Sequence, residues 1–152
     1  MTNFPDLSHP LRQSDWLAGF IDGEGHLGIG VNTQRGCYWP VLDITQRDDD
    51  EALMREVGLA LGASITITSG TRDGQNPIVR CCVAKKSSLL GVVSYLDADP
   101  LRTKKASEYV IWRGAVFAYV EHGWSSPVIK EAKVRISAMR NYAFKDNPFV
   151  NG

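Results

Sequence analysis

The sequence has no excess of positive charge, few cysteines and no long apolar run. Its 152 residues include 17 Lys and Arg and 17 Asp and Glu, so the formal net charge is zero. Proteins that neutralise nucleic-acid phosphates usually carry a basic excess, so a nucleic-acid surface here must gather its cations on one face. No apolar run reaches the roughly 20 residues of a membrane-spanning helix, so we expect no membrane partner.

The cysteine content argues against a disulfide framework. The chain holds 3 cysteines, and Cys81 and Cys82 are adjacent, so their side chains point to opposite faces of an expected strand. The first residues also lack the basic and apolar regions of a secretion signal. We therefore expect an intracellular, reducing location, either a bacterial or phage-host cytoplasm or an organelle, and not secretion.

The composition is that of a globular domain, with 43% hydrophobic and 22% charged residues. A chain of this length buries about 70% of its unfolded surface and holds one domain. We expect a single domain over residues 1–152, with an extended N-terminal arm (1–13), a core (14–121) and a C-terminal helix and tail (122–152).

Hydrophobic periodicity predicts an α+β fold. Alternating residues indicate strands over 26–32, 37–46, 65–68 and 78–84, and helical spacing indicates helices over 16–24, 48–61, 86–96, 104–121 and 127–142. The acidic run at 48–50 is interpreted as a helix N-terminus and not as a metal cluster. The order predicts a curved four-stranded antiparallel sheet with helices on one face.

The short helix from Trp16 to Glu24 contains two glycines, which each cost about 1 kcal/mol relative to alanine. Gly19 and Gly23 are four residues apart and lie on one face, so they suit the close approach of another backbone. Glu24 follows between two glycines at the tip of the helix. A carboxylate held there could bind a metal ion at an interface.

Leu17 to Gly25 resembles the nine-residue signature of the LAGLIDADG homing endonucleases, with Phe20, Gly23 and Glu24 as accepted replacements. The resemblance extends over about 14–121 and implies the family's αββαββα fold. The similar Leu-Asp-Ala-Asp at 96–99 is not a second signature, because Pro100 stands where glycine is needed. With one signature per chain, the resemblance implies a homodimer joined through this helix, at Leu17, Ala18, Gly19, Ile21, Asp22 and Gly23.

The resemblance also implies the catalytic residues Glu24, Gln46 and Lys104, with Lys105 as the alternative lysine because this segment aligns with a possible gap. Glu24 and the Gly23 carbonyl would bind Mg²⁺ or another divalent cation such as Mn²⁺, whereas Ca²⁺ could bind without supporting cleavage. Asp22 is expected to accept hydrogen bonds from backbone N–H groups that support the helix pair.

The open face of the sheet is expected to contact double-stranded DNA, although polar strand faces are often only solvated. Its candidate contacts include the loop residues Arg35 and Arg72 and the strand residues His26, Gly28, Gly30, Asn32, Trp39, Val41, Asp43, Thr66, Thr68 and Arg80.

The function that the resemblance implies is that of a site-specific homing endonuclease of the intron-associated type. It would hydrolyse both strands of a long pseudo-palindromic DNA target as a homodimer with a divalent metal. Two alternatives on the same fold are an RNA-binding intron maturase and a DNA-binding protein without cleavage.

Overall fold

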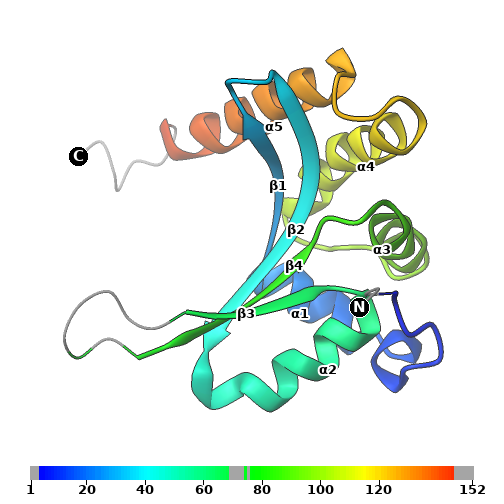
Figure 1. The fold of residues 1–152 in the computed structure, drawn as a ribbon, viewed down its shortest axis with the longest axis vertical. Helices are drawn as coiled ribbons and strands as arrows, with labels where there is room; N and C mark the ends of the chain where they lie inside the picture. The colour runs from blue at the N-terminus through cyan, green and yellow to red at the C-terminus, as the bar shows by residue number, and fades with distance from the viewer. Residues whose placement is uncertain (1–3, 69–73, 75, 146–152) are drawn as a thin grey trace.

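The computed structural model describes residues 4–68, 74 and 76–145. Within these residues, helices alternate with two β-hairpins, in the predicted order (Figure 1). The strands are β1 (Gly25–Asn32), β2 (Cys37–Arg47), β3 (Ser64–Thr68) and β4 (Ile78–Val83). The helices are η1 (Pro10–Gln13), α1 (Trp16–Glu24), η2 (Asp48–Asp50), α2 (Glu51–Leu61), α3 (Lys86–Ala98), α4 (Lys105–His122) and α5 (Pro127–Lys145).

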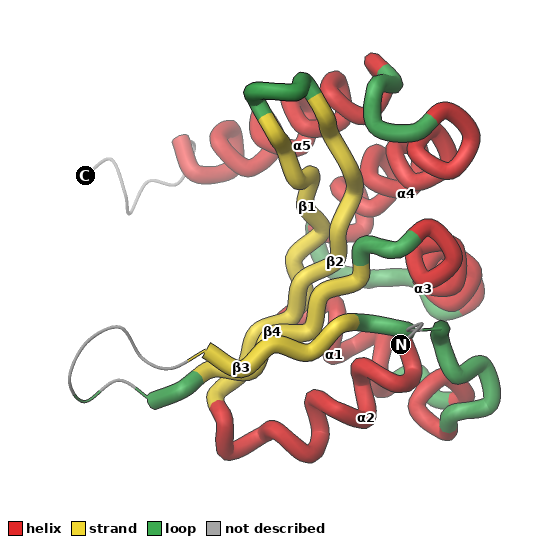
Figure 2. The backbone as a smooth tube through the Cα atoms, viewed as in Figure 1, coloured by secondary structure: helices red, strands yellow, loops and turns green. Residues whose placement is uncertain are grey.

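The four strands form one antiparallel sheet in the order β1-β2-β4-β3. The sheet is strongly curved, and α1 to α4 pack along one side of it (Figure 2). The α+β prediction is therefore confirmed. Among the described residues, no helix is both long and apolar enough to cross a membrane.

The core lies between the sheet and the helices because each strand turns one apolar phase toward them. Leu27, Leu42 and Ile44 are almost fully buried against helix residues such as Trp112. The Trp112 ring nitrogen donates to the carbonyls of Gly28 (3.2 Å) and Val41 (3.0 Å). A buried polar atom is therefore satisfied, and α4 is tied to the first hairpin.

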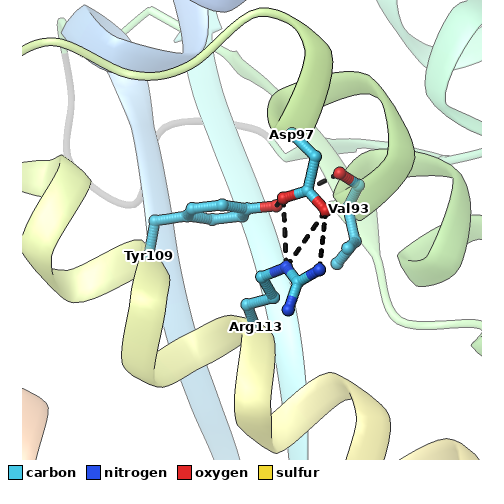
Figure 3. Close-up of polar contacts among 4 residues, drawn as sticks. All are labelled: Val93, Asp97, Tyr109 and Arg113. Carbon is cyan, nitrogen blue, oxygen red and sulfur yellow. Dashed lines mark hydrogen bonds and ion pairs between the residues drawn. The ribbon is translucent and has the colours of Figure 1, made fainter.

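A polar cluster between α3 and α4 explains the Leu-Asp-Ala-Asp segment (Figure 3). Asp97 accepts a hydrogen bond from the Tyr109 hydroxyl (2.7 Å) and pairs with Arg113 (2.8 Å). The Arg113 hydrogen bond is the main cause that lowers the pKa of Asp97, and burial opposes it. This aspartate joins two helices and takes no part in a second signature.

The N-terminal arm differs from the expected extended segment, because residues 10–13 form the 3₁₀ turn η1. The Arg12 guanidinium donates to the carbonyls of Ala60 (3.2 Å) and Gly91 (3.1 Å). Pro5 packs against Gly62, which ends α2 in a left-handed conformation (φ 66°). The arm therefore joins α2 to α3.

Candidate active site

Glu24 stands at the junction of α1 and β1. The chain passes directly from the helix into the strand, and the Gly25 N–H caps the helix by donating to the Ile21 carbonyl. Because Gly25 lies opposite Ile44 in the sheet, the end of β2 reaches the same junction. There the Gln46 amide donates to the exposed Glu24 carboxylate over 3.0 Å. The structure thus brings together two of the three residues expected to be catalytic.

Lys105, at the start of α4, is the lysine that reaches this junction. Its Nζ donates to the carbonyls of Ile21 (3.1 Å) and Asp22 (2.8 Å), where the helix dipole favours a cation. Burial lowers the pKa of Lys105, although nearby carboxylates, Asp22 foremost, oppose this effect. Lys104 is the exposed N-cap residue of α4. The geometry therefore favours Lys105, where the sequence-based choice was Lys104.

Asp22 accepts hydrogen bonds from backbone N–H groups, as expected, but they belong to its own chain. The donors are the N–H groups of Arg102 (2.9 Å) and Thr103 (3.1 Å), together with the Thr103 hydroxyl (2.6 Å). Burial raises the pKa of Asp22, but the Thr103 and Arg102 hydrogen bonds outweigh it and the net pKa is lowered. Asp22 therefore holds the segment that starts α4, and its expected place at the dimer interface stays a prediction.

The two faces of α1 have different environments. Leu17 and Ile21 are fully buried in the core of this chain, and Ala18 is 6% exposed. These three residues pack against this chain's own core, so they give little exposed surface, and their place in a dimer interface stays a prediction. A Cβ atom added at Gly19 or Gly23 would meet nothing within 4 Å, so the glycine face is open.

Two aromatic residues on this open face were missed by the sequence analysis. Trp16 and Phe20 stack with ring centroids 4.9 Å apart, and Trp16 is 43% exposed. With Gly19 and Gly23 they occupy positions i, i+3, i+4 and i+7 of one helical face. This spacing in the sequence could have indicated that the two rings share a face with the glycines. We define the open face as Trp16, Gly19, Phe20 and Gly23.

The open side of the sheet carries most of the polar candidates. Thr66, Thr68, His26, Asn32 and Arg35 are exposed. Arg80 is also exposed and pairs with Asp43 across the strands (2.7 Å). His26 has an exposed surface, but partial burial of its ring, followed by the charge of Arg140, lowers its pKa. Arg72 lies outside the described residues.

Three candidate DNA contacts are covered by neighbouring side chains. Val41 is only 8% exposed. Gly28 is buried beneath His26 and Val41, and the Trp39 ring covers Gly30. Strand alternation does not show that larger neighbours lie over the two glycines.

One chain supplies few metal ligands. Within residues 4–68, 74 and 76–145, no three His, Cys, Asp or Glu side chains are grouped so that they could hold a metal ion. Glu24 and the Gly23 carbonyl are oxygen donors of the kind that Mg²⁺ prefers. Glu24 is therefore not part of a group of three such side chains in the described part of the chain.

The fold is similar to that of solved homing endonucleases. The homing endonuclease I-TnaI is 26% identical, with a TM-score of 0.61 over 80% of this chain and 81% of that chain. The LAGLIDADG meganuclease I-AabMI, bound to uncleaved DNA, is 24% identical with a TM-score of 0.66 over 82% of this chain and 44% of that chain. I-SmaMI, bound to an uncleaved DNA target in the presence of calcium ions, is 21% identical with a TM-score of 0.64, over 83% and 44%.

A curated relative and a family model also match the chain. The intron-encoded RNA maturase bI4 of Saccharomyces cerevisiae is 24% identical over 99 residues, which are 65% of this chain and 14% of the maturase. This chain thus spans a small part of that protein. The model of the LAGLIDADG endonuclease family matches residues 17–116, which is well over half of the chain. This range includes Glu24, Gln46 and Lys105 at the α1–β1 junction. The chain belongs to the LAGLIDADG endonuclease family.

Proposed function

We propose that this protein is a homodimeric, metal-dependent, site-specific endonuclease that cleaves both strands of a long pseudo-palindromic DNA target. The observation that carries the proposal is the meeting of Glu24, Gln46 and Lys105 at the end of α1. They come from α1, β2 and α4, so the fold itself assembles a carboxylate, an amide and a cation.

The open face of α1 supports the homodimer. Gly19 and Gly23 leave room for the backbone of another helix, and the flanking rings of Trp16 and Phe20 supply apolar surface. A two-fold contact is self-complementary, so each chain would bring its own Glu24 to the axis. Two adjacent carboxylates raise each other's pKa unless a cation lies between them.

The residues present fit a divalent ion with oxygen ligands. Glu24 and the Gly23 carbonyl of each chain would hold it, and phosphate oxygens of the DNA would complete the coordination. When bound, such an ion polarises the phosphoryl group and stabilises the leaving oxygen. Gln46 orients the Glu24 carboxylate through its hydrogen bond, and Lys105 supplies positive charge toward the scissile phosphate.

The open side of the sheet would lie in a DNA groove, where strand side chains can read base edges. Thr66, Thr68 and Arg80 are exposed on adjacent strands and fit this role. Because Arg80 already pairs with Asp43, its charge is partly balanced before DNA binds. Identical subunits would read the two halves of the target, which explains the expected near-palindrome.

The test is cleavage of a plasmid library of random inserts in Mg²⁺, with sequencing of the ends produced. We expect the wild type to give fragments with recurring ends and Glu24→Gln to give none. Glu56→Gln changes an exposed glutamate on α2 and is the matched control, which should cut like the wild type. If the wild type cuts at no recurring sequence, or Glu24→Gln cuts as well, the proposal is wrong.

An RNA maturase is the second candidate, and the similarity to the yeast maturase favours it. Retained Glu24 and Gln46 argue for cleavage, because a splicing role alone does not need them. One experiment distinguishes the endonuclease from the maturase. A maturase without nuclease activity would bind and splice a structured intron RNA, cut no DNA, and be unaffected by Glu24→Gln.

A further inference from the structure

A pocket at the turn end of the first hairpin lies far from Glu24. β4 pairs with β2 only from Leu42 onward, so the first residues of β2 lack a β4 partner there. The turn between α4 and α5 fills part of this space, because the Tyr38 N–H donates to the Trp124 carbonyl (3.2 Å). Figure 1 shows both turns at the same end of the molecule. Along β1, Asn32 at this end is eight residues from Glu24, which is about 26 Å at about 3.3 Å per residue.

The pocket has a volume of about 310 Å³, which is within the range of small-molecule sites. An adjoining hollow is also lined by Tyr119 and Trp124, and its lining includes Lys86 and His122. We define the distal pocket by its main lining residues: Asn32, Arg35, Cys37, Trp39, Tyr119 and Trp124.

Trp124 is the feature that suggests a ligand. Trp124 is 57% exposed, yet its ring nitrogen donates to the hydroxyl of the mostly buried Tyr119 over 2.9 Å. Gly123 has a φ of 78°, a conformation that a residue with a side chain rarely adopts, and so it turns the chain to present Trp124. A large ring held in one orientation while facing solvent is ready to stack against a planar group.

Cations surround the aromatic residues. The Lys86 ammonium lies 5.1 Å from the centre of the Tyr119 ring, and Arg35 is an exposed lining residue. His122 is close to Glu121 (3.8 Å), so its charge is partly offset. Among the described residues that line the pocket and the hollow, none is a carboxylate. In a chain with zero net charge, this is a local segregation of positive charge beside aromatic rings.

We propose that the distal pocket and the adjoining hollow together bind an unpaired nucleotide, with the base stacked on Trp124 and the phosphate held by Arg35 of the pocket and Lys86 of the hollow. Aromatic platforms next to cations are the means by which proteins bind single-stranded nucleic acids. A base within a duplex is stacked on both faces and cannot enter. The proposal therefore assigns Asn32, Arg35 and Trp39, which the sequence analysis expected to contact duplex DNA, to an unpaired nucleotide. The site is separate from the cleavage centre and does not need its chemistry.

The test measures binding of fluorescein-labelled oligouridylate and oligothymidylate without divalent metal, in a Glu24→Gln background. Success or failure here is thus independent of nuclease activity. We expect Trp124→Ala to weaken binding about tenfold and Trp124→Tyr to restore most of it. Lys86→Ala should flatten the dependence of affinity on salt concentration, because one phosphate contact is lost.

The matched control is Phe117→Ala, which removes an exposed aromatic ring of α4 that is not among the lining residues. Weakening with RNA alone would assign the pocket to RNA and involve the ribose 2′-hydroxyl. Weakening with DNA alone, or equally with both, would assign it to single-stranded DNA or to base and phosphate together. If Trp124→Ala binds both oligomers as tightly as Phe117→Ala does, the proposal is overturned.

Discussion

The Nζ of Lys105 donates a hydrogen bond of 2.8 Å to the main-chain oxygen of Asp22, two residues before Glu24. In return, the Asp22 carboxylate holds the backbone of Thr103, two residues before Lys105. The end of α1 and the start of α4 are thus joined by two opposite sets of hydrogen bonds. This reciprocal arrangement places a partly buried cation beside the proposed catalytic acid.

The first prediction compares Lys105→Ala with Lys104→Ala. We expect the Lys105 variant to lose about a hundredfold or more in single-turnover cleavage rate, as is typical when a preorganised charge is removed. Lys104→Ala should remain within a few-fold of the wild type, because its side chain is exposed. Circular dichroism should show both variants folded. A larger loss in Lys104→Ala would restore the sequence-based choice.

The second prediction concerns the open face of α1. Gly19→Leu should abolish the dimer in sedimentation experiments, because the side chain would fill the space left for a partner helix. Yet it should not destabilise the isolated chain, since nothing lies within 4 Å of the new Cβ and leucine is a better helix former by about 1 kcal/mol.

Gly114→Leu is the control for this substitution. Gly114 lies in α4, and a Cβ added there also meets nothing within 4 Å. The Gly114→Leu variant gains the same helix propensity as Gly19→Leu and should leave the dimer intact. A dimer that survives Gly19→Leu would contradict the assignment of the interface to α1.

Most of the fold could be predicted from the sequence because its patterns are local. Leu27 and Ile29 alternate in β1, and their phase identified the side of the sheet that meets the helices, although Val31 at the far end of the same phase is exposed. The choice between Lys104 and Lys105 could not be made in this way. It depends on how Asp22 anchors Thr103, a contact between residues 81 apart in the chain.

The two faces of α1 also show which features can be predicted from local sequence and which depend on contacts between distant residues. The cost of the glycines in a helix predicted a face that another backbone approaches. A Cβ added at Gly19 or Gly23 meets nothing within 4 Å, so there is room for such an approach, and the partner helix itself stays a prediction. Leu17 and Ile21 were also expected at the dimer interface, because the resemblance covers the whole motif and does not distinguish the buried face of the helix from the open face. Only packing against this chain's own sheet decides which apolar residues are already buried.

The third prediction is a pH dependence of stability. The folded-state pKa of Asp22 is lowered, so its ionised form stabilises the fold above the ordinary Asp pKa of about 4. That contribution is lost as the pH falls through the lower folded-state pKa. Asp22→Asn should therefore be less stable than the wild type by about 1–2 kcal/mol at pH 7. The difference should shrink below about pH 4.

Urea denaturation at pH 7, 5 and 3 would measure this difference. Asp49→Asn is the control, because Asp49 is an exposed carboxylate with only a long 3.9 Å approach to Arg47. Its stability difference from the wild type should be small at each pH. An Asp22→Asn difference that stays constant from pH 7 to pH 3 would show that the charge of Asp22 does not contribute.

The last prediction concerns α5, which lies beyond the residues matched by the family model. Arg140 donates to both carboxylate oxygens of Glu108 (3.0 and 3.2 Å) and to the Leu27 carbonyl (2.8 Å). Glu108 is only 8% exposed and lies one helical turn from Lys105. α5 therefore joins the first strand to the helix that carries the proposed catalytic lysine.

Arg140→Met should lower the free energy of unfolding by about 2–4 kcal/mol, because it leaves Glu108 as an unpaired buried charge. Replacing both residues by methionine should cost less than the single change, since the stranded carboxylate is then removed as well. Arg135→Met, an exposed change on the same helix, should have little effect in the same urea titrations. If the double variant is the less stable of the two, the ion pair contributes to stability in some way other than by neutralising Glu108.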